Sequence, residues 1–138
     1  MEMETLILER KEHFLWIKLN RPEALNALNT QMAKDLLSVA QDAALDQDIW
    51  VIGITSTTDK AFGVGADLKE RKDMTAGEIS SQRVLFTRTT LALKSLPQPV
   101  IAGVKGFALG GGLETALWAD IIIAGETPNS ACPKSAWG

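Results

Sequence analysis

The feature of this sequence that most constrains its fold is a run of three glycines, residues 110–112, between a short apolar run and an apparent helix. Without Cβ atoms the backbone can adopt positive φ angles and press closely against a ligand. The helix predicted over 113–119 would direct its free N–H groups and its positive dipole end toward whatever occupies the turn. Glu114 stands near the start of that helix, where a carboxylate is placed to move a proton. The run therefore predicts an oxyanion-stabilising turn with an attached acid or base.

The rest of the chain predicts strands alternating with helices. Runs of β-forming residues predict five strands, of which the first two form a hairpin, at 5–10, 14–19, 50–54, 100–104 and 121–124. The last of these is apolar on successive residues, as expected for a strand covered on both faces. Helices alternating with such strands indicate an α/β layer structure with largely parallel pairing.

Two longer helices are predicted between these strands. Asn29 or Thr30 caps the first, whose apolar face carries Met32, Leu36, Val39, Ala40 and Ala43. Thr75 begins the second, and its apolar residues recur seven positions apart at Ile79, Phe86 and Leu93. Prolines at 97 and 99 end that helix.

Composition excludes several classes of protein. The 138 residues are 46% hydrophobic and 22% charged with a net charge of −3, which is typical of a single soluble globular domain. No basic stripe and no bilayer-length apolar run occurs, so we expect neither nucleic-acid nor membrane partners. The single cysteine, Cys132, fits a reducing compartment and a cytoplasmic location. The single histidine, His13, is expected at the surface, and we expect no metal site. Residues 1–125 form the expected core, and 126–138 read as a divergent, irregular tail.

A second glycine-containing turn, 63–66, follows the strand predicted at 50–54, as the triple-glycine turn follows 100–104. In a parallel sheet both turns fall at the same carboxyl-end edge, where ligands usually bind. An N–H from each turn aimed at one oxygen would form an oxyanion hole, in which a single donor can be worth ~3 kcal/mol to the transition state. The alternative is that these glycines only make tight turns. A phosphate-binding loop is disfavoured because neither turn matches a nucleotide motif.

Three segments, residues 19–28, 61–71 and 99–120, resemble the crotonase (enoyl-CoA hydratase/isomerase) superfamily in order and spacing. The likeness extends from about residue 6 to about 126. It implies the ClpP/crotonase fold, a spiral of ββα units. It also implies that the chain corresponds to the N-terminal half, truncated before the C-terminal helices that build trimers.

The resemblance also implies roles for individual residues. Backbone N–H groups of Ala66 and Gly111 would hold the thioester oxygen, and Glu114 would act as acid or base. Coenzyme A would run past residues of two segments, namely Ala24, Ala27, Val64, Gly65, Ala66, Asp67, Leu68 and Gly111. No metal and no separate cofactor is implied, and relatives form homo-oligomers, either trimers or hexamers. We interpret Asp67 as a residue that orders its loop, residues 69–71 as a solvated helix face, and Asp120 as a junction between helix and strand.

The chain departs from the family pattern at its end. Counting on from Asp120 without gaps puts Lys134 where hydratases have a second catalytic glutamate. Three hypotheses follow: a 2-enoyl-CoA hydratase acting through Glu114, an acyl-CoA isomerase or decarboxylase with the same oxyanion hole, and a catalytically impaired or inactive acyl-CoA-binding homologue.

Overall fold

The computed structural model describes residues 3–108 and 119–125. The chain begins with an antiparallel hairpin in which β1 (Leu6–Lys11) pairs with β2 (Phe14–Leu19). Glu12, in the two-residue turn, has a positive φ of 54°. The predicted hairpin is confirmed.

The main sheet has five strands in the order β1-β2-β3-β5-β7. The three further strands are β3 (Val51–Ser56), β5 (Val100–Val104) and β7 (Ile121–Ala124). Each pairs in parallel with its neighbour, and only the β1–β2 pair is antiparallel. Parallel neighbours need long crossovers, and here α1 follows β2 and α3 follows β3. The predicted α/β class with largely parallel pairing is confirmed.

Helix α1 (Thr30–Leu45) supplies much of the core. Asn29 is its N-cap, and the Asn29 side chain accepts a hydrogen bond of 2.8 Å from the Met32 N–H. The face predicted to be apolar is buried throughout, at Met32, Leu36, Val39, Ala40 and Ala43. These residues pack in one cluster with alternate residues of β2 and with β3 and β5. The helix face and its cap were both predicted from the sequence.

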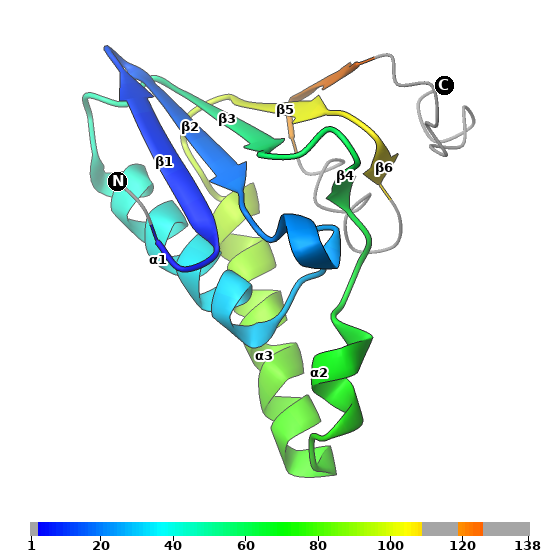
Figure 1. Ribbon diagram of the computed structural model, residues 1–138. Coiled ribbons are helices and arrows are strands. Elements are labelled where there is room, and N and C mark those ends of the chain that lie inside the picture. The colour runs from blue at the N-terminus through cyan, green and yellow to red at the C-terminus, as the bar shows by residue number, and fades with distance from the viewer. Residues whose placement is uncertain (1–2, 109–118, 126–138) are drawn as a thin grey trace.

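Helix α3 (Ala76–Lys94) starts with a capping box formed by Thr75 and Glu78 and packs along α1 on the same side of the sheet (Figure 1). Its apolar face was predicted only in part. Leu93 is buried, but the other residues of α3 that are buried are polar, Gln82 and Thr89. Thr89 donates a hydrogen bond of 3.1 Å to the Ala33 carbonyl of α1. The contact between these helices is therefore partly a polar one.

Two short strands, β4 (Ala61–Gly63) and β6 (Phe107–Ala108), form a separate parallel pair. With them the order of elements is β1-β2-α1, then β3-β4 followed by α2 (Leu68–Lys72) and α3, then β5-β6. This is the repeated ββα arrangement of the predicted spiral. In chain order, β4 and β6 thus stand between β3 or β5 and the glycine-containing segments, which the sequence placed directly after β3 and β5.

Two predictions about the strands were wrong. Trp50 is not part of the third strand; it is 60% exposed and stacks on the ring of His13, itself a surface residue as predicted. In β7, Ile121 and Ile123 are 54% and 60% exposed, so this strand is not covered on both faces. Ile122 between them packs against the core, so Ile121 and Ile123 lie on the other face of the sheet. Ile121 is in register with Ile101.

Candidate functional site

The candidate site is built around the loop that follows β4. Gly65 has a φ of 97°, a conformation that suits glycine and few other residues. Leu28 makes an isolated parallel bridge with Ala66: the Leu28 N–H donates to the Gly65 carbonyl (2.8 Å), and the Asp67 N–H donates to the Leu28 carbonyl (2.9 Å). In a parallel bridge of this kind the central residue points its own N–H and C=O away from the partner strand. The Ala66 N–H therefore faces away from Leu28, and no described residue accepts a hydrogen bond from it.

The strands that precede the two glycine-containing segments, β4 and β6, pair with each other. Gly63 is in register with Ala108, and both strands run in the same direction. Ala66 lies three residues beyond Gly63, and Gly111 lies three residues beyond Ala108. Gly111 and Glu114 themselves are outside the described residues. That the two glycine-containing segments meet stays a prediction.

Asp67 orders the loop, as the sequence interpretation predicted. Its Oδ1 atom caps α2, accepting from the N–H groups of Lys69 (3.0 Å) and Glu70 (3.2 Å). Its Oδ2 atom lies 3.1 Å from Nη2 of Arg21. Burial opposes ionisation of this carboxyl, but the hydrogen bonds from Glu70 and Arg21 outweigh it, so the pKa of Asp67 lies below its usual value. The side chain is thus an ionised link between the loop, α2 and the segment around Arg21.

That segment has an unusual backbone. After the short 3-10 helix Pro22–Ala24, two consecutive residues that are not glycine have positive φ angles, Leu25 (52°) and Asn26 (56°). Such conformations cost roughly 1–3 kcal/mol each and persist where the surroundings fix them. The Asn26 side chain does this: it accepts from the Arg21 N–H (2.8 Å) and donates to Ser56 Oγ (2.7 Å). Arg21 and Asn26 were not predicted as site residues, because no local pattern in the sequence indicates these contacts.

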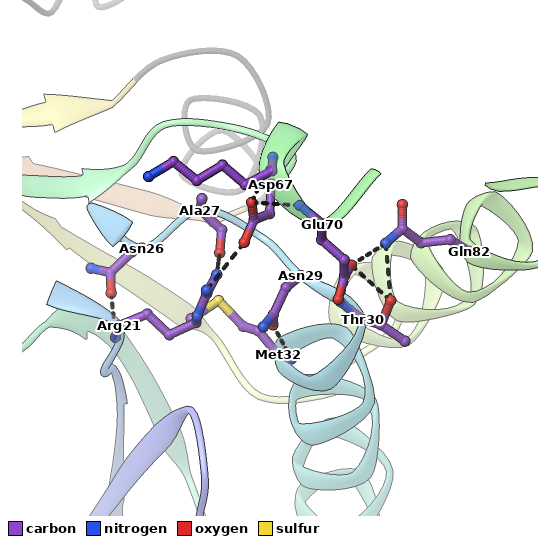
Figure 2. A network of polar contacts seen from close by, with 10 residues as sticks. Arg21, Asn26, Ala27, Asn29, Thr30, Met32, Asp67, Glu70 and Gln82 are labelled. Carbon is purple, nitrogen blue, oxygen red and sulfur yellow. Dashed lines mark hydrogen bonds and ion pairs between the residues drawn. The ribbon is translucent and has the colours of Figure 1, made fainter. Parts of the chain in front are cut away.

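A second set of polar contacts joins α2 to both long helices (Figure 2). Oε1 of Glu70 accepts from the backbone N–H of Thr30 (3.0 Å) and from Nε2 of Gln82 (2.6 Å). The Nε of Arg71 donates to Oε1 of Gln82 (2.8 Å). The prediction that residues 69–71 form a solvated face was therefore wrong for Glu70 and Arg71, whereas Lys69 is exposed. A five-residue helix carries too little periodicity to reveal which of its charged residues face inward.

The bridge at Leu28 also places the two predicted coenzyme A segments side by side. Of their described residues, Ala27 and Gly65 are buried, and Ala24, Val64, Ala66 and Asp67 are half-buried. Leu68 is 74% exposed and directly follows the capping aspartate. The contacts of these residues with coenzyme A stay a prediction.

Asp120 lies at the start of β7, where the sequence predicted a junction residue. Its Oδ2 atom accepts from the Val100 N–H (2.8 Å), and its own N–H donates to the Val100 carbonyl (2.9 Å). It therefore fixes the register of β7 against β5.

Other candidate sites are less developed. A cleft of about 770 Å³ lies between α1 and the first half of α3, but none of the predicted site residues lines it. Within residues 3–108 and 119–125, no three histidine, cysteine or acidic side chains gather as a metal site would require. No helix in that part of the chain is both long and apolar enough to span a membrane.

A repeated ββα arrangement that superposes on a solved enoyl-CoA hydratase defines a crotonase-fold protein. Comparison with known proteins gives the family. The sequence model described as enoyl-CoA hydratase/isomerase matches residues 9–138, and the chain belongs to that family.

Individual relatives agree with this assignment. A putative enoyl-CoA hydratase/isomerase of Bacillus subtilis, YngF, is 42% identical over 91% of this chain and 48% of its own length. The short-chain-enoyl-CoA hydratase of Clostridium acetobutylicum is 36% identical over all of this chain and 53% of its own. The crystal structure of an enoyl-CoA hydratase from Bacillus anthracis superposes with a TM-score of 0.84 at 33% identity, covering 88% of this chain and 47% of that one. The chain thus spans about half the length of the relatives it matches.

Proposed function

We propose that this chain binds the thioester of a 2-enoyl-CoA and hydrates its double bond. The observation that carries the proposal is the Ala66 N–H, which is held between two hydrogen bonds to Leu28 and has no acceptor among the described residues. Because this donor is already fixed, it does not have to reorient when charge develops on a substrate oxygen. Gly111 would supply the second donor from the neighbouring turn.

The chemistry follows from where charge develops. Water adds its oxygen to C3 of the enoyl group, and the electron pair of the double bond moves to form an enolate on the thioester oxygen. Ala66 and Gly111 donate hydrogen bonds to that oxygen. Glu114 accepts a proton from the water, and a proton is delivered to C2 to complete the hydration. General acid–base help of this kind typically contributes 10²–10⁴-fold, and no cofactor besides the coenzyme A of the substrate is required.

Support for acyl-CoA as the substrate comes from the relatives and from the surface around the donor. The names of the relatives specify enoyl-CoA hydratases, including a 2,3-dehydroadipyl-CoA hydratase of Escherichia coli at 38% identity. Beside Ala66, Leu68 offers an exposed apolar side chain. We include self-association in the proposal, because the exposed isoleucines of β7 form an apolar surface of the kind that marks interfaces.

The direct test is to incubate the purified chain with crotonyl-CoA and to follow the loss of the enoyl absorbance. Glu114→Gln keeps the size of the side chain and removes its basicity, so turnover should fall by about 10²-fold or more while acyl-CoA still binds. Equal turnover by the variant would exclude Glu114 as the acid or base. A flat trace with retained binding would indicate an acyl-CoA-binding homologue, and proton exchange at C2 without hydration would indicate an isomerase.

A further inference from the structure

Arg21 contacts Asn26, Ala27 and Asp67 (Figure 2). Its Nη1 atom donates to the Ala27 carbonyl, and its Nη2 atom lies 3.1 Å from Oδ2 of Asp67. One guanidinium group thus joins the segment 24–28 to the loop 64–67. These are the two segments that the Leu28 bridge also connects.

We propose that Arg21 is a positioning residue, which holds the Ala66 N–H in the direction needed for a substrate oxygen by tying Asp67 to the Ala27 carbonyl. The inference rests on the proposed function, because it assigns Arg21 to the same oxyanion site. Arg21 does not act on the substrate itself. It acts through the residues on either side of the donor.

The low exposure of the Arg21–Asp67 ion pair explains how it can hold the loop in one conformation. The side chains of Arg21 and Asp67 are 16% and 12% exposed, so water screens their attraction little. In such surroundings a charge-assisted hydrogen bond is stronger than a neutral one and favours one geometry. Arg10 and Asp46 form a second arginine–aspartate pair at 2.8 Å, but their side chains are 42% and 34% exposed. Exposed pairs of this kind contribute little, and the second pair therefore provides a matched control.

The path from Arg21 to the donor is short. Asp67 follows Ala66 directly, and its backbone N–H is bonded to Leu28. Its other carboxylate oxygen caps α2 independently of Arg21. Removal of the guanidinium should therefore leave α2 and the sheet folded while the peptide plane at Ala66 loses one of its restraints.

The test is amide NMR of the whole 138-residue chain and of Arg21→Ala, Arg21→Lys, Asp67→Asn and, as the control, Arg10→Ala. In the free protein we expect Arg21→Ala to move the amide signals of Gly65, Ala66 and Asp67. Added guanidinium chloride at low concentration should move them back, whereas added sodium chloride at the same ionic strength should not. Arg10→Ala should leave these three signals in place. Arg21→Lys keeps the charge but cannot bond both Ala27 and Asp67 in the same way, so it should give an intermediate shift.

A second stage adds butyryl-CoA, whose saturated acyl chain cannot be hydrated. In the wild type, the Ala66 amide proton should move downfield as it donates to the thioester oxygen, and this response should shrink in Arg21→Ala. With crotonyl-CoA as substrate, Arg21→Ala should lower kcat by about 10- to 100-fold with a much smaller change in KM.

The outcomes separate the positioning role from the function. Unchanged signals of Gly65, Ala66 and Asp67 in a folded Arg21→Ala protein would overturn the positioning role, whatever the chain binds. If Arg21→Ala does not fold, the amide signals of residues 65–67 are compared between the wild type and the variants Arg21→Lys and Asp67→Asn. Signals that coincide with those of the wild type would overturn the positioning role. If the free-protein signals move as expected but butyryl-CoA leaves the wild-type Ala66 amide unchanged, the positioning role is supported and the proposed function fails.

Discussion

The surroundings of Ala66 and the strand β7 are two regions that differ in whether their side chains find partners within the chain. Around Ala66, charged and amide side chains from distant parts of the chain satisfy one another and hold a strained backbone in place. In β7, Ile121 and Ile123 expose more than half of their surface. The contacts that hold Ala66 all lie within the described residues, so substitutions in this chain can test them. The second region should govern how the chain behaves in solution.

The largest effect should come from removing the carboxylate at the centre of the first region. Asp67→Ala loses both the ion pair with Arg21 and the N-cap of α2 and leaves a largely buried guanidinium without its partner. We expect the free energy of unfolding to fall by roughly 2–4 kcal/mol, as measured by urea denaturation. The matched change Asp46→Ala, at the exposed pair, should have a clearly smaller effect. Equal losses in the two variants would show that the contacts around Ala66 are no stronger than ordinary surface contacts.

A smaller effect is expected from a single methyl group at Gly65. Its φ of 97° is unfavourable for a residue with a Cβ atom. Gly65→Ala should therefore destabilise the protein by about 1–2 kcal/mol and weaken the response of the Ala66 amide to butyryl-CoA.

The control for this substitution is Gly77, in the first turn of α3, where an added Cβ would meet only the Thr75 hydroxyl at 3.9 Å. Gly77→Ala should stabilise by about 0.5–1 kcal/mol. Thermal unfolding of the two variants gives the comparison, and a stabilised Gly65→Ala protein would mean that the loop does not require its observed conformation.

A substitution in β7 should have the smallest effect on stability but the clearest effect on association. Ile123→Lys changes an exposed side chain, so the free energy of unfolding should stay within about 0.5 kcal/mol of the wild type. Sedimentation velocity should show fewer oligomers, because a charge on this strand opposes pairing with another chain. Leu45→Lys, at an exposed apolar position on α1, should leave association unchanged. Identical sedimentation of Ile123→Lys and the wild type would exclude the apolar face of β7 as the interface.

Sequence reasoning predicted the parts of the fold that have local causes. The cap at Asn29, the apolar face of α1 and the start of α3 at Thr75 all follow from residues within one or two turns. It missed the features that depend on partners far away in the chain. Arg21 and Asp67 are 46 positions apart, and no local pattern connects them.

The short strands β4 and β6 and the polar contacts between the helices were not predicted, for related reasons. β4 and β6 have three and two residues, too few for an alternating pattern to be recognised. Gln82 is buried because Glu70, Thr30 and Arg71 satisfy its amide, whereas a count of apolar residues assigns glutamine to the surface. The donor role of Ala66 came from the family resemblance, since a backbone N–H leaves no trace in the side-chain pattern.

The central claim is that the Ala66 N–H polarises a thioester oxygen, and the carbonyl stretch of bound butyryl-CoA tests it most directly. Isotope-edited infrared difference spectra, recorded with ¹³C at the thioester carbonyl, isolate that one vibration in the complex with the 138-residue chain. We expect a clear shift to lower wavenumber on binding, because hydrogen bonds from the backbone donors draw electron density onto the oxygen. A bound thioester that absorbs at the same wavenumber as free butyryl-CoA would contradict it.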